Sequence, residues 1–133
     1  MIVLDASVAV SWLLNEGPTP RLDSILAAHD IIVPSHWTVE VSHGILKALR
    51  RKTISQEHLS GIASDLDALS ISVQPPIDVA SVLPLLKFAR EQGLTMYDAA
   101  YVQLARNRTA KLATLDKAMG QTAAKLGIEM LVE

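Results

Sequence analysis

Four short apolar segments, separated by stretches long enough for helices, constrain the fold of this chain more than any other feature. They are rich in isoleucine, valine and leucine and cover residues 1–5, 31–33, 71–73 and 111–115. Short runs of this kind are typical of strands buried on both faces. Their alternation with helical patterns predicts an α/β fold, in which helices flank both faces of a parallel sheet. A fifth run, 128–132, is a candidate edge strand, so we expect four or five strands.

The stretches between the strands carry helix start and stop signals. Ser55 and Thr95 are suitable N-caps, Gly93 is a suitable C′ residue, and Pro84 should kink or divide the helix that contains it. No repeat, linker or low-complexity stretch is evident, so we expect residues 1–133 to form a single domain. The predicted helices cover residues 6–14, 20–29, 35–52, 55–69, the segment from Pro76 to Gly93, 95–107 and 116–127.

Composition excludes several classes of protein. The chain has no cysteine, which removes disulfides, thiolate zinc sites and cysteine nucleophiles. No apolar run is long enough to span a bilayer, and Met1 leads straight into a strand without the basic start of a signal peptide. We therefore expect a cytoplasmic protein that makes no membrane contact. The formal net charge of −2 means that any contact with nucleic acid must use local basic clusters, such as 47–52.

Four acidic residues stand where strands end or helices begin. Asp5 follows the first strand, Glu40 and Asp98 lie in the first turns of helices, and Asp116 follows the fourth strand. In an open parallel sheet the working site lies at the carboxyl ends of the strands. The four side chains can therefore point into one crevice.

Each acid also has a structural explanation. Asp5 and Asp116 could cap helices, and Asp98 could complete a capping box with Thr95. Glu40 could pair with Lys47 or be solvated. Taken one at a time, these explanations are the commoner use of an acid at a helix start.

Carboxylates gathered in one place need a positive counter-charge. No lysine or arginine is adjacent in sequence to Asp5 or Asp98. Oxygen ligands suit hard cations, so Mg²⁺ or Mn²⁺ is the expected cofactor. One or two such ions can activate a water and clamp the oxygens of an in-line phosphoryl displacement.

The surroundings of these acids resemble a known family. The PIN-domain ribonucleases, and among them the VapC-type toxins of toxin–antitoxin pairs, are similar to this chain in MIVLDAS, WTVEVSHGIL, GLTMYDAAYVQLA and LATLD. The resemblance implies a PIN-like fold in which Asp5, Glu40, Asp98 and Asp116 form the catalytic site. It also implies that Asp5 and Asp98 bind Mg²⁺ (or Mn²⁺). Glu40 would position or activate the attacking water or help to hold a second ion, and Asp116 would act through water.

The same resemblance implies supporting residues and partners. Ser7 and Thr114 match small hydroxyl positions that orient the carboxylates. Family members often carry Asn at the place of His43, which could bond Glu40, touch substrate or be an ordinary helix residue. The implied activity is endonucleolytic cleavage of RNA, of tRNA or rRNA type, that leaves a 5′-phosphate. The implied partners are a second copy in a homodimer and a small VapB-like antitoxin.

Other assignments remain open at this stage. A strand-end aspartate also opens aspartyl-phosphate phosphatases and receiver domains, but neither class explains Glu40 together with Asp98. A PIN-fold module that binds RNA or protein without cutting is the main alternative. The four histidines lack zinc spacing and are expected on the surface or in loops. Packing is the expected role of Tyr97 and Tyr101, although Tyr97 could stack on a base.

Overall fold

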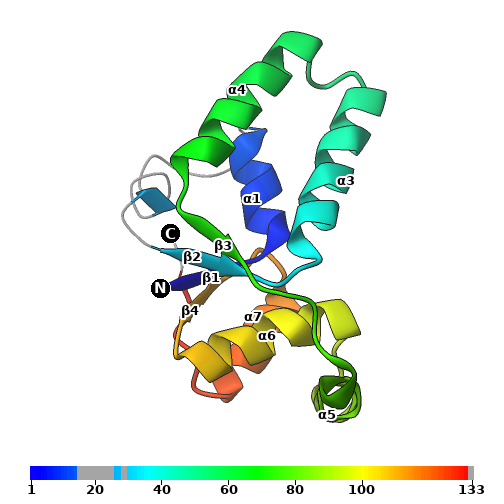
Figure 1. Ribbon diagram of the computed structural model, residues 1–133, viewed down its shortest axis with the longest axis vertical. Helices are drawn as coiled ribbons and strands as arrows, with labels where there is room; N and C mark the ends of the chain where they lie inside the picture. The colour runs from blue at the N-terminus through cyan, green and yellow to red at the C-terminus, as the bar shows by residue number, and fades with distance from the viewer. Residues whose placement is uncertain (15–25, 28–29, 132–133) are drawn as a thin grey trace.

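The central element is a parallel sheet, shown in Figure 1, a computed structural model that describes residues 1–14, 26–27 and 30–131. The strand order is β3-β2-β1-β4, and every pairing is parallel. The predicted α/β architecture with four strands is confirmed. The strands are β1 (Ile2–Leu4), β2 (Ile31–Val33), β3 (Ile71–Val73) and β4 (Lys111–Ala113).

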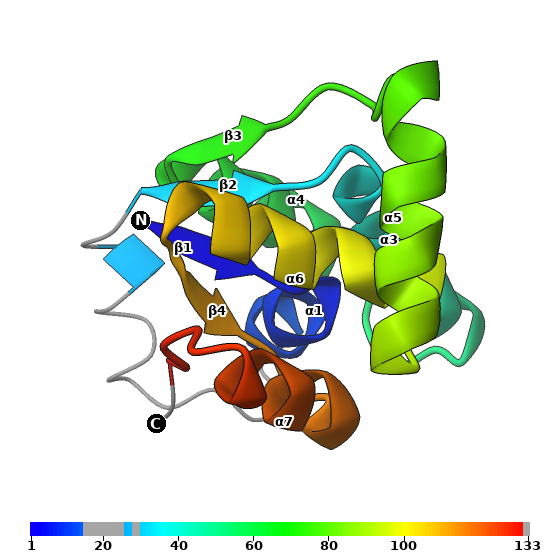
Figure 2. The same ribbon diagram turned by 90° about the horizontal axis from the view of Figure 1, so that it is seen from below.

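Helices cover both faces of the sheet, as predicted. On one side lie α1 (Ala6–Leu13), α3 (Trp37–Arg50) and α4 (Gln56–Ala68). On the other side lie α5 (Val79–Gln92), α6 (Met96–Arg108) and α7 (Lys117–Lys125), with α6 directly over β1 and β4 (Figure 2). Most of the helix predicted over 20–29 falls outside the described residues. No helix among those described is long and apolar enough to cross a membrane.

The tail after α7 differs from the predicted edge strand. Met130 makes an isolated parallel bridge with Leu112. Two hydrogen bonds hold it there, from Leu112 N to Glu129 O at 3.0 Å and from Leu131 N to Leu112 O at 2.9 Å. The main chain therefore meets β4 at one residue and does not add a fifth strand within the described range.

The helix boundaries follow local chemistry. Ser55 accepts a hydrogen bond from His58 N at the start of α4, as an N-cap should. Gly93 ends α5 with φ of 67°, a left-handed conformation that glycine adopts without strain. The prediction that Pro84 would divide its helix is wrong, because α5 continues through it. The carbonyl of Ala80, which loses its helical partner to Pro84, belongs to an exposed residue that water can reach.

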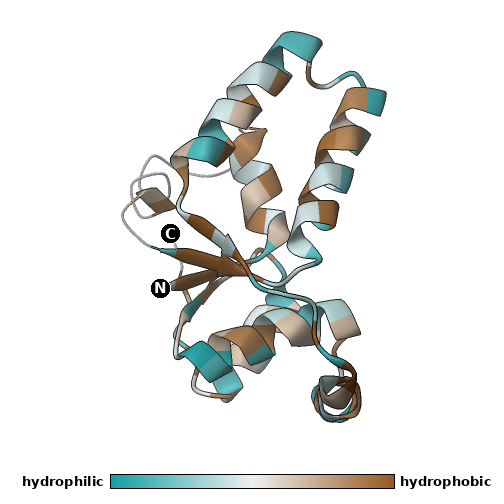
Figure 3. Ribbon diagram, viewed as in Figure 1, coloured by the Kyte–Doolittle hydropathy of each residue, from teal (hydrophilic) through white to brown (hydrophobic). Residues whose placement is uncertain are grey.

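The core lies on both sides of the two central strands, which are brown in the hydropathy colouring of Figure 3. All residues of β1 and β2 are buried, whereas β3 at the edge is partly exposed. Leu13 and Leu14 at the end of α1 are buried and belong to this core. Because β1 is central and fully enclosed, the chain leaves the core at Asp5, where the candidate site begins.

Candidate active site

Asp5 is the one polar or charged residue that is buried in the described part of the chain, with 6% of its surface exposed. Its main-chain N donates to Ala113 O at 2.9 Å, which ties the residue to the end of β4. Its Oδ2 accepts hydrogen bonds from Ser7 Oγ at 2.6 Å and Thr114 Oγ1 at 2.8 Å. The side chain makes no capping bond to α1. Asp5 therefore occupies the N-cap position of α1, but the capping bond suggested for its side chain is not formed.

Ser7 and Thr114 are each held from both sides. Ser7 Oγ accepts from Leu115 N at 3.2 Å, and Thr114 Oγ1 accepts from Asp116 N at 3.0 Å. With a main-chain amide on the oxygen, each hydroxyl directs its own proton at Asp5. Both bonds fall on Oδ2, so Oδ1 of Asp5 makes no hydrogen bond with any described residue.

Glu40 is fixed by a side chain from the opposite face of the sheet. Its Oε1 accepts a 2.6 Å hydrogen bond from the hydroxyl of Tyr101, which is fully buried in α6. The same hydroxyl accepts from Ala6 N at 3.4 Å. Burial, followed by the bond to Glu40 and the charge of Glu40, raises the pKa of Tyr101 well above its usual range, so the phenol stays a donor. The suggested pairing of Glu40 with Lys47 is not formed.

Asp98 is the carboxylate whose pKa responds to the other three acids. It lies half-buried in the first turn of α6, where Thr95 Oγ1 caps the helix by accepting from Asp98 N at 3.1 Å. Burial raises the pKa of Asp98, and the negative charges of Asp116, Asp5 and Glu40 raise it further. Asp116, Asp5 and Glu40 therefore each lie close enough to repel Asp98, although the four acids come from four separate segments.

Asp116 combines a cap with a place in this acidic group. Its Oδ1 accepts from Met119 N at 3.0 Å, so the capping role predicted for Asp116 is confirmed. The side chain is also exposed, and it is the largest electrostatic contributor to the raised pKa of Asp98. Asp116 therefore both caps α7 and contributes negative charge to the site.

The donor set was tested for its fit to a divalent cation. Within the described residues, no group of three or more Asp, Glu, His or Cys side chains could hold a metal ion by itself. A cage made entirely of protein ligands is thus not present. Mg²⁺ does not require one, because it keeps several waters and binds through one or two carboxylates. An all-oxygen set of mutually repelling acids, with no lysine or arginine in ion-pair contact among the described residues, suits such an ion.

Two residues that sequence reasoning missed, His36 and Tyr101, belong to this site. His36 was expected on the surface or in a loop, but its Nε2 is buried and lies 3.4 Å from Glu40 Oε1 without forming a hydrogen bond. Its ring contacts Tyr97 and Tyr101 edge-on, at centroid distances of 5.4 and 5.1 Å. Helical spacing carried the signal, since His36 precedes Glu40 by four residues and Tyr101 follows Asp98 by three.

His43, the departure from the family pattern, does not join the site's network. It is exposed on α3, and its side chain makes no hydrogen bond with another described residue. The suggested bond from His43 to Glu40 is therefore not formed.

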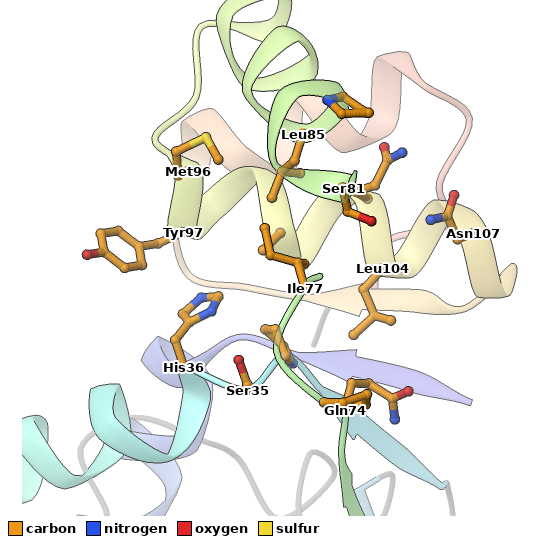
Figure 4. A pocket seen from close by; sticks show the side chains of 15 residues that line it. Ser35, His36, Gln74, Ile77, Ser81, Leu85, Met96, Tyr97, Leu104 and Asn107 are labelled. Carbon is orange, nitrogen blue, oxygen red and sulfur yellow. The ribbon is translucent and has the colours of Figure 1, made fainter. Parts of the chain in front are cut away.

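Two hollows adjoin the carboxylates. A pocket of about 480 Å³ lies between the start of α3, the segment before α5, and α6, with His36 and Tyr97 at one end and Asn107 at the other (Figure 4). A cleft of about 550 Å³ runs between α1 and α3. It is lined by Ala6, Ser7, Val10, Ser11, Leu14, Glu40, Gly44, Lys47, Ala48, Arg51, Thr53 and Leu115.

Comparison with known proteins places this arrangement in a family. The model of the PIN domain matches residues 2–125. The crystal structure of PAE2754 from Pyrobaculum aerophilum shares the fold, with a TM-score of 0.65 at 20% identity over 91% of this chain and 83% of that one. The crystal structure of FitAcB from Neisseria gonorrhoeae gives a TM-score of 0.64 at 17% identity, over 99% and 97% of the two chains.

A curated relative narrows the assignment within the family. "Ribonuclease VapC12" of Mycobacterium tuberculosis is 31% identical over 127 residues, which cover 92% of this chain and 92% of that protein. The chain therefore belongs to the PIN-domain family and, within it, to the VapC-type ribonucleases.

Proposed function

We propose that this chain is a metal-dependent endoribonuclease, the toxin of a VapBC-type toxin–antitoxin pair. The observation that carries the proposal is the acidic group itself, in which burial and then the charges of Asp116, Asp5 and Glu40 raise the pKa of Asp98. Carboxylates whose pKa is raised by burial and by one another are typical of sites that hold a cation or carry out a reaction. The ribonuclease names of the curated relatives support RNA as the substrate.

The residues of the site divide the proposed hydrolysis among them. Asp5 and Asp98 would hold Mg²⁺ or Mn²⁺, which supplies a Lewis acid and an activated water when bound. Ser7 and Thr114 fix Oδ2 of Asp5, which would leave Oδ1 oriented and available to hold the cation.

Glu40 is the residue best suited to orient the attacking water. The bond from Tyr101 occupies its Oε1, which leaves Oε2 to accept the proton of that water. Hydrolysis of the phosphodiester would leave a 5′-phosphate on one fragment. Asp116, at the exposed rim, would act through solvent.

A second copy of the chain is the expected structural partner. Four apolar side chains follow one face of α5 and are exposed, with values of 90% for Val79, 40% for Val82, 72% for Leu83 and 47% for Leu86. Their i, i+3, i+4 and i+7 spacing is that of a helix face that packs against another surface. We propose that this face forms the homodimer. A VapB-like antitoxin completes the proposed assembly, on the strength of the family assignment.

The principal test is cleavage of total bacterial RNA by the purified, antitoxin-free chain, with Mg²⁺ or Mn²⁺ and with EDTA. We expect discrete new 5′-phosphate ends that require metal and disappear in Asp98→Asn. Asp67→Asn, which removes an exposed acid from α4, is the matched control and should cut like the unmodified chain. Equal cutting by Asp98→Asn, or no cutting by the metal-loaded chain, would favour a PIN-fold module that binds without cleaving.

A further inference from the structure

We propose that the cleft between α1 and α3 is a phosphate-binding track, in which Lys47 and Arg51 hold the RNA strand beyond the bond that is cut. This inference rests on the proposed function and adds to it the path of the substrate. It concerns side chains that lie outside the carboxylate group and take no part in the chemistry.

The cleft connects the acidic group to a basic end. Ser7 and Glu40 line it where it meets the site, and Lys47, Arg51 and Thr53 line it further along. The sequence indicates a basic cluster at 47–52 but does not relate it to the four acids. The structure shows that two of them share one cavity with Glu40.

Helix geometry explains which basic residues face the cleft. At 100° per residue, Lys47 and Arg51 lie within about 20° of Glu40 around the axis of α3, whereas Arg50 lies about 80° away. The rise of 1.5 Å per residue puts Lys47 about 10 Å and Arg51 about 16 Å from Glu40 along the axis. These spans correspond to about three to five nucleotides of a stacked strand, at about 3.4 Å each.

Gly44 sets the depth of the cleft midway between its two ends. A methyl group at this position would meet Val10 Cγ2 at 2.7 Å, so only glycine lets α1 and α3 approach this closely. Val10 is β-branched and therefore stiff in a helix, and it cannot turn aside at low cost. Gly44 and Val10 both line the cleft, so this close contact lies within it, between Glu40 and Lys47.

The positive charge of Lys47 and Arg51 favours a polyanion as the occupant of the cleft. Within the described residues neither Lys47 nor Arg51 forms an ion pair, and both are exposed. A phosphodiester strand whose reacting phosphate lies at the carboxylates has its phosphates about three to five nucleotides further along within reach of these cations. Contacts of this kind position the strand without reading its bases.

The test compares two double variants that lose the same charge from the same helix end. Lys47→Gln with Arg51→Gln removes the cleft pair, and Arg50→Gln with Lys52→Gln removes neighbours that do not line the cleft. Binding is measured by fluorescence anisotropy with a labelled 16-nucleotide single-stranded RNA of mixed sequence. Both pairs are placed on the Asp98→Asn background in Mg²⁺, so that the RNA stays intact.

We expect the cleft pair to raise the Kd by roughly fivefold to tenfold and the control pair to change it little. Each phosphate contact contributes about 0.7 to the slope of log K against log salt for a single strand. The cleft pair should therefore flatten this slope by about 1.4, between 50 and 200 mM KCl. On the chain with Asp98 intact, KM for RNA should rise while kcat is kept.

Equal Kd values and equal salt slopes for the two double variants would overturn the proposal that this cleft binds phosphates. Loss of binding to a decaglutamate peptide with RNA binding unchanged would also overturn it and assign the cleft to an acidic protein segment. Failure of the proposed function is a separate result, because it appears as absence of cutting by the unmodified chain. The anisotropy experiment does not depend on cutting.

Discussion

Asp5 and Asp98, the two carboxylates proposed to bind the metal, are held in opposite ways. Asp5 is buried and receives two hydroxyl hydrogen bonds on one oxygen. Asp98 is half-buried, and the three other acids of the site raise its pKa. One ligand is thus preorganised by neutral donors, and the other is left in an unfavourable field that a cation would relieve. In the proposed metal site, Asp5 would fix the geometry, and Asp98 would gain most from the charge of the cation.

The largest expected effect comes from substituting Asp5, the carboxylate that two hydroxyl groups hold in place. Asp5→Asn keeps the size of the side chain but removes its charge and changes one carboxylate oxygen to an amide. We expect the single-turnover rate of RNA cleavage to fall by about 10³-fold or more. Circular dichroism should show an unchanged fold. Retention of a tenth of the activity would mean that Asp5 has a structural role and that the metal is bound elsewhere.

A smaller loss should follow from removing what holds Asp5. Ser7→Ala and Thr114→Ala each leave the carboxylate in place with one donor fewer, and we expect cleavage rates to fall by about 10- to 100-fold. Ser64→Ala is the control, because this hydroxyl bonds only to Ser60 O in its own helix among the described residues. Rates for the two site variants that match the control would show that the hydroxyls do not direct Asp5.

Substitution of Asp98, the acid whose pKa is raised, should be detected first as a change in the thermal stability of the chain and only then as a change in activity. Asp98→Asn removes a carboxyl whose pKa in the folded chain is above the ordinary 3.8, so in EDTA at pH 7 its Tm should exceed that of the unmodified chain by a few degrees. A raised folded pKa means that stability falls as the pH rises through it. The gain should therefore shrink on acidification, where Asp98 is already protonated. Mn²⁺ should raise the Tm of the unmodified chain more than that of the variant, as differential scanning fluorimetry would show.

A Tm for Asp98→Asn at or below that of the unmodified chain at pH 7 would contradict the strain assigned to this residue. Asp67→Asn should show no pH-dependent difference, since Asp67 is an exposed acid on α4. The pair of variants separates the local field from a general effect of net charge.

The smallest effect is expected at Asp116, which lies at the exposed rim of the site. Asp116→Asn retains a good N-cap for α7, because Asn and Asp cap about equally well, but it removes the charge that most raises the pKa of Asp98 after burial. We expect Tm to change by less than in Asp98→Asn and cleavage to fall by less than about tenfold. A loss as large as that of Asp5→Asn would place Asp116 in direct contact with the reaction.

Most of the fold was predictable because its signals are local. Strand composition, the caps at Ser55 and Thr95, and the glycine at position 93 each act within a few residues and were confirmed. The gathering of the four acids was also predictable, since parallel strands bring their carboxyl ends to one edge. What local reasoning missed depends on distant contacts.

Tyr101 and the α1–α3 cleft show why the remainder was out of reach. The bond from Tyr101 to Glu40 joins residues 61 apart. The three-residue spacing from Asp98 indicates that Tyr101 lies near that acid, but it does not indicate that Tyr101 reaches Glu40. The face of α3 that carries Lys47 and Arg51 could be derived from helical spacing. Its role required knowing that α1 packs beside it, which Gly44 and Val10 decide together.

The bond between Thr114 and Asp5 spans 109 residues and has a consequence for how the protein is made. Thr114 follows Asp5 by 109 residues, so its hydroxyl leaves the ribosome well after the carboxylate that it holds. Tyr101, which joins α6 to Glu40 and to the start of α1, also follows both of its partners. A nascent chain that ends before residue 101 therefore carries Asp5 and Glu40 without the contacts from Thr114 and Tyr101. The contacts that organise these two acids are complete only after residue 114 has been added.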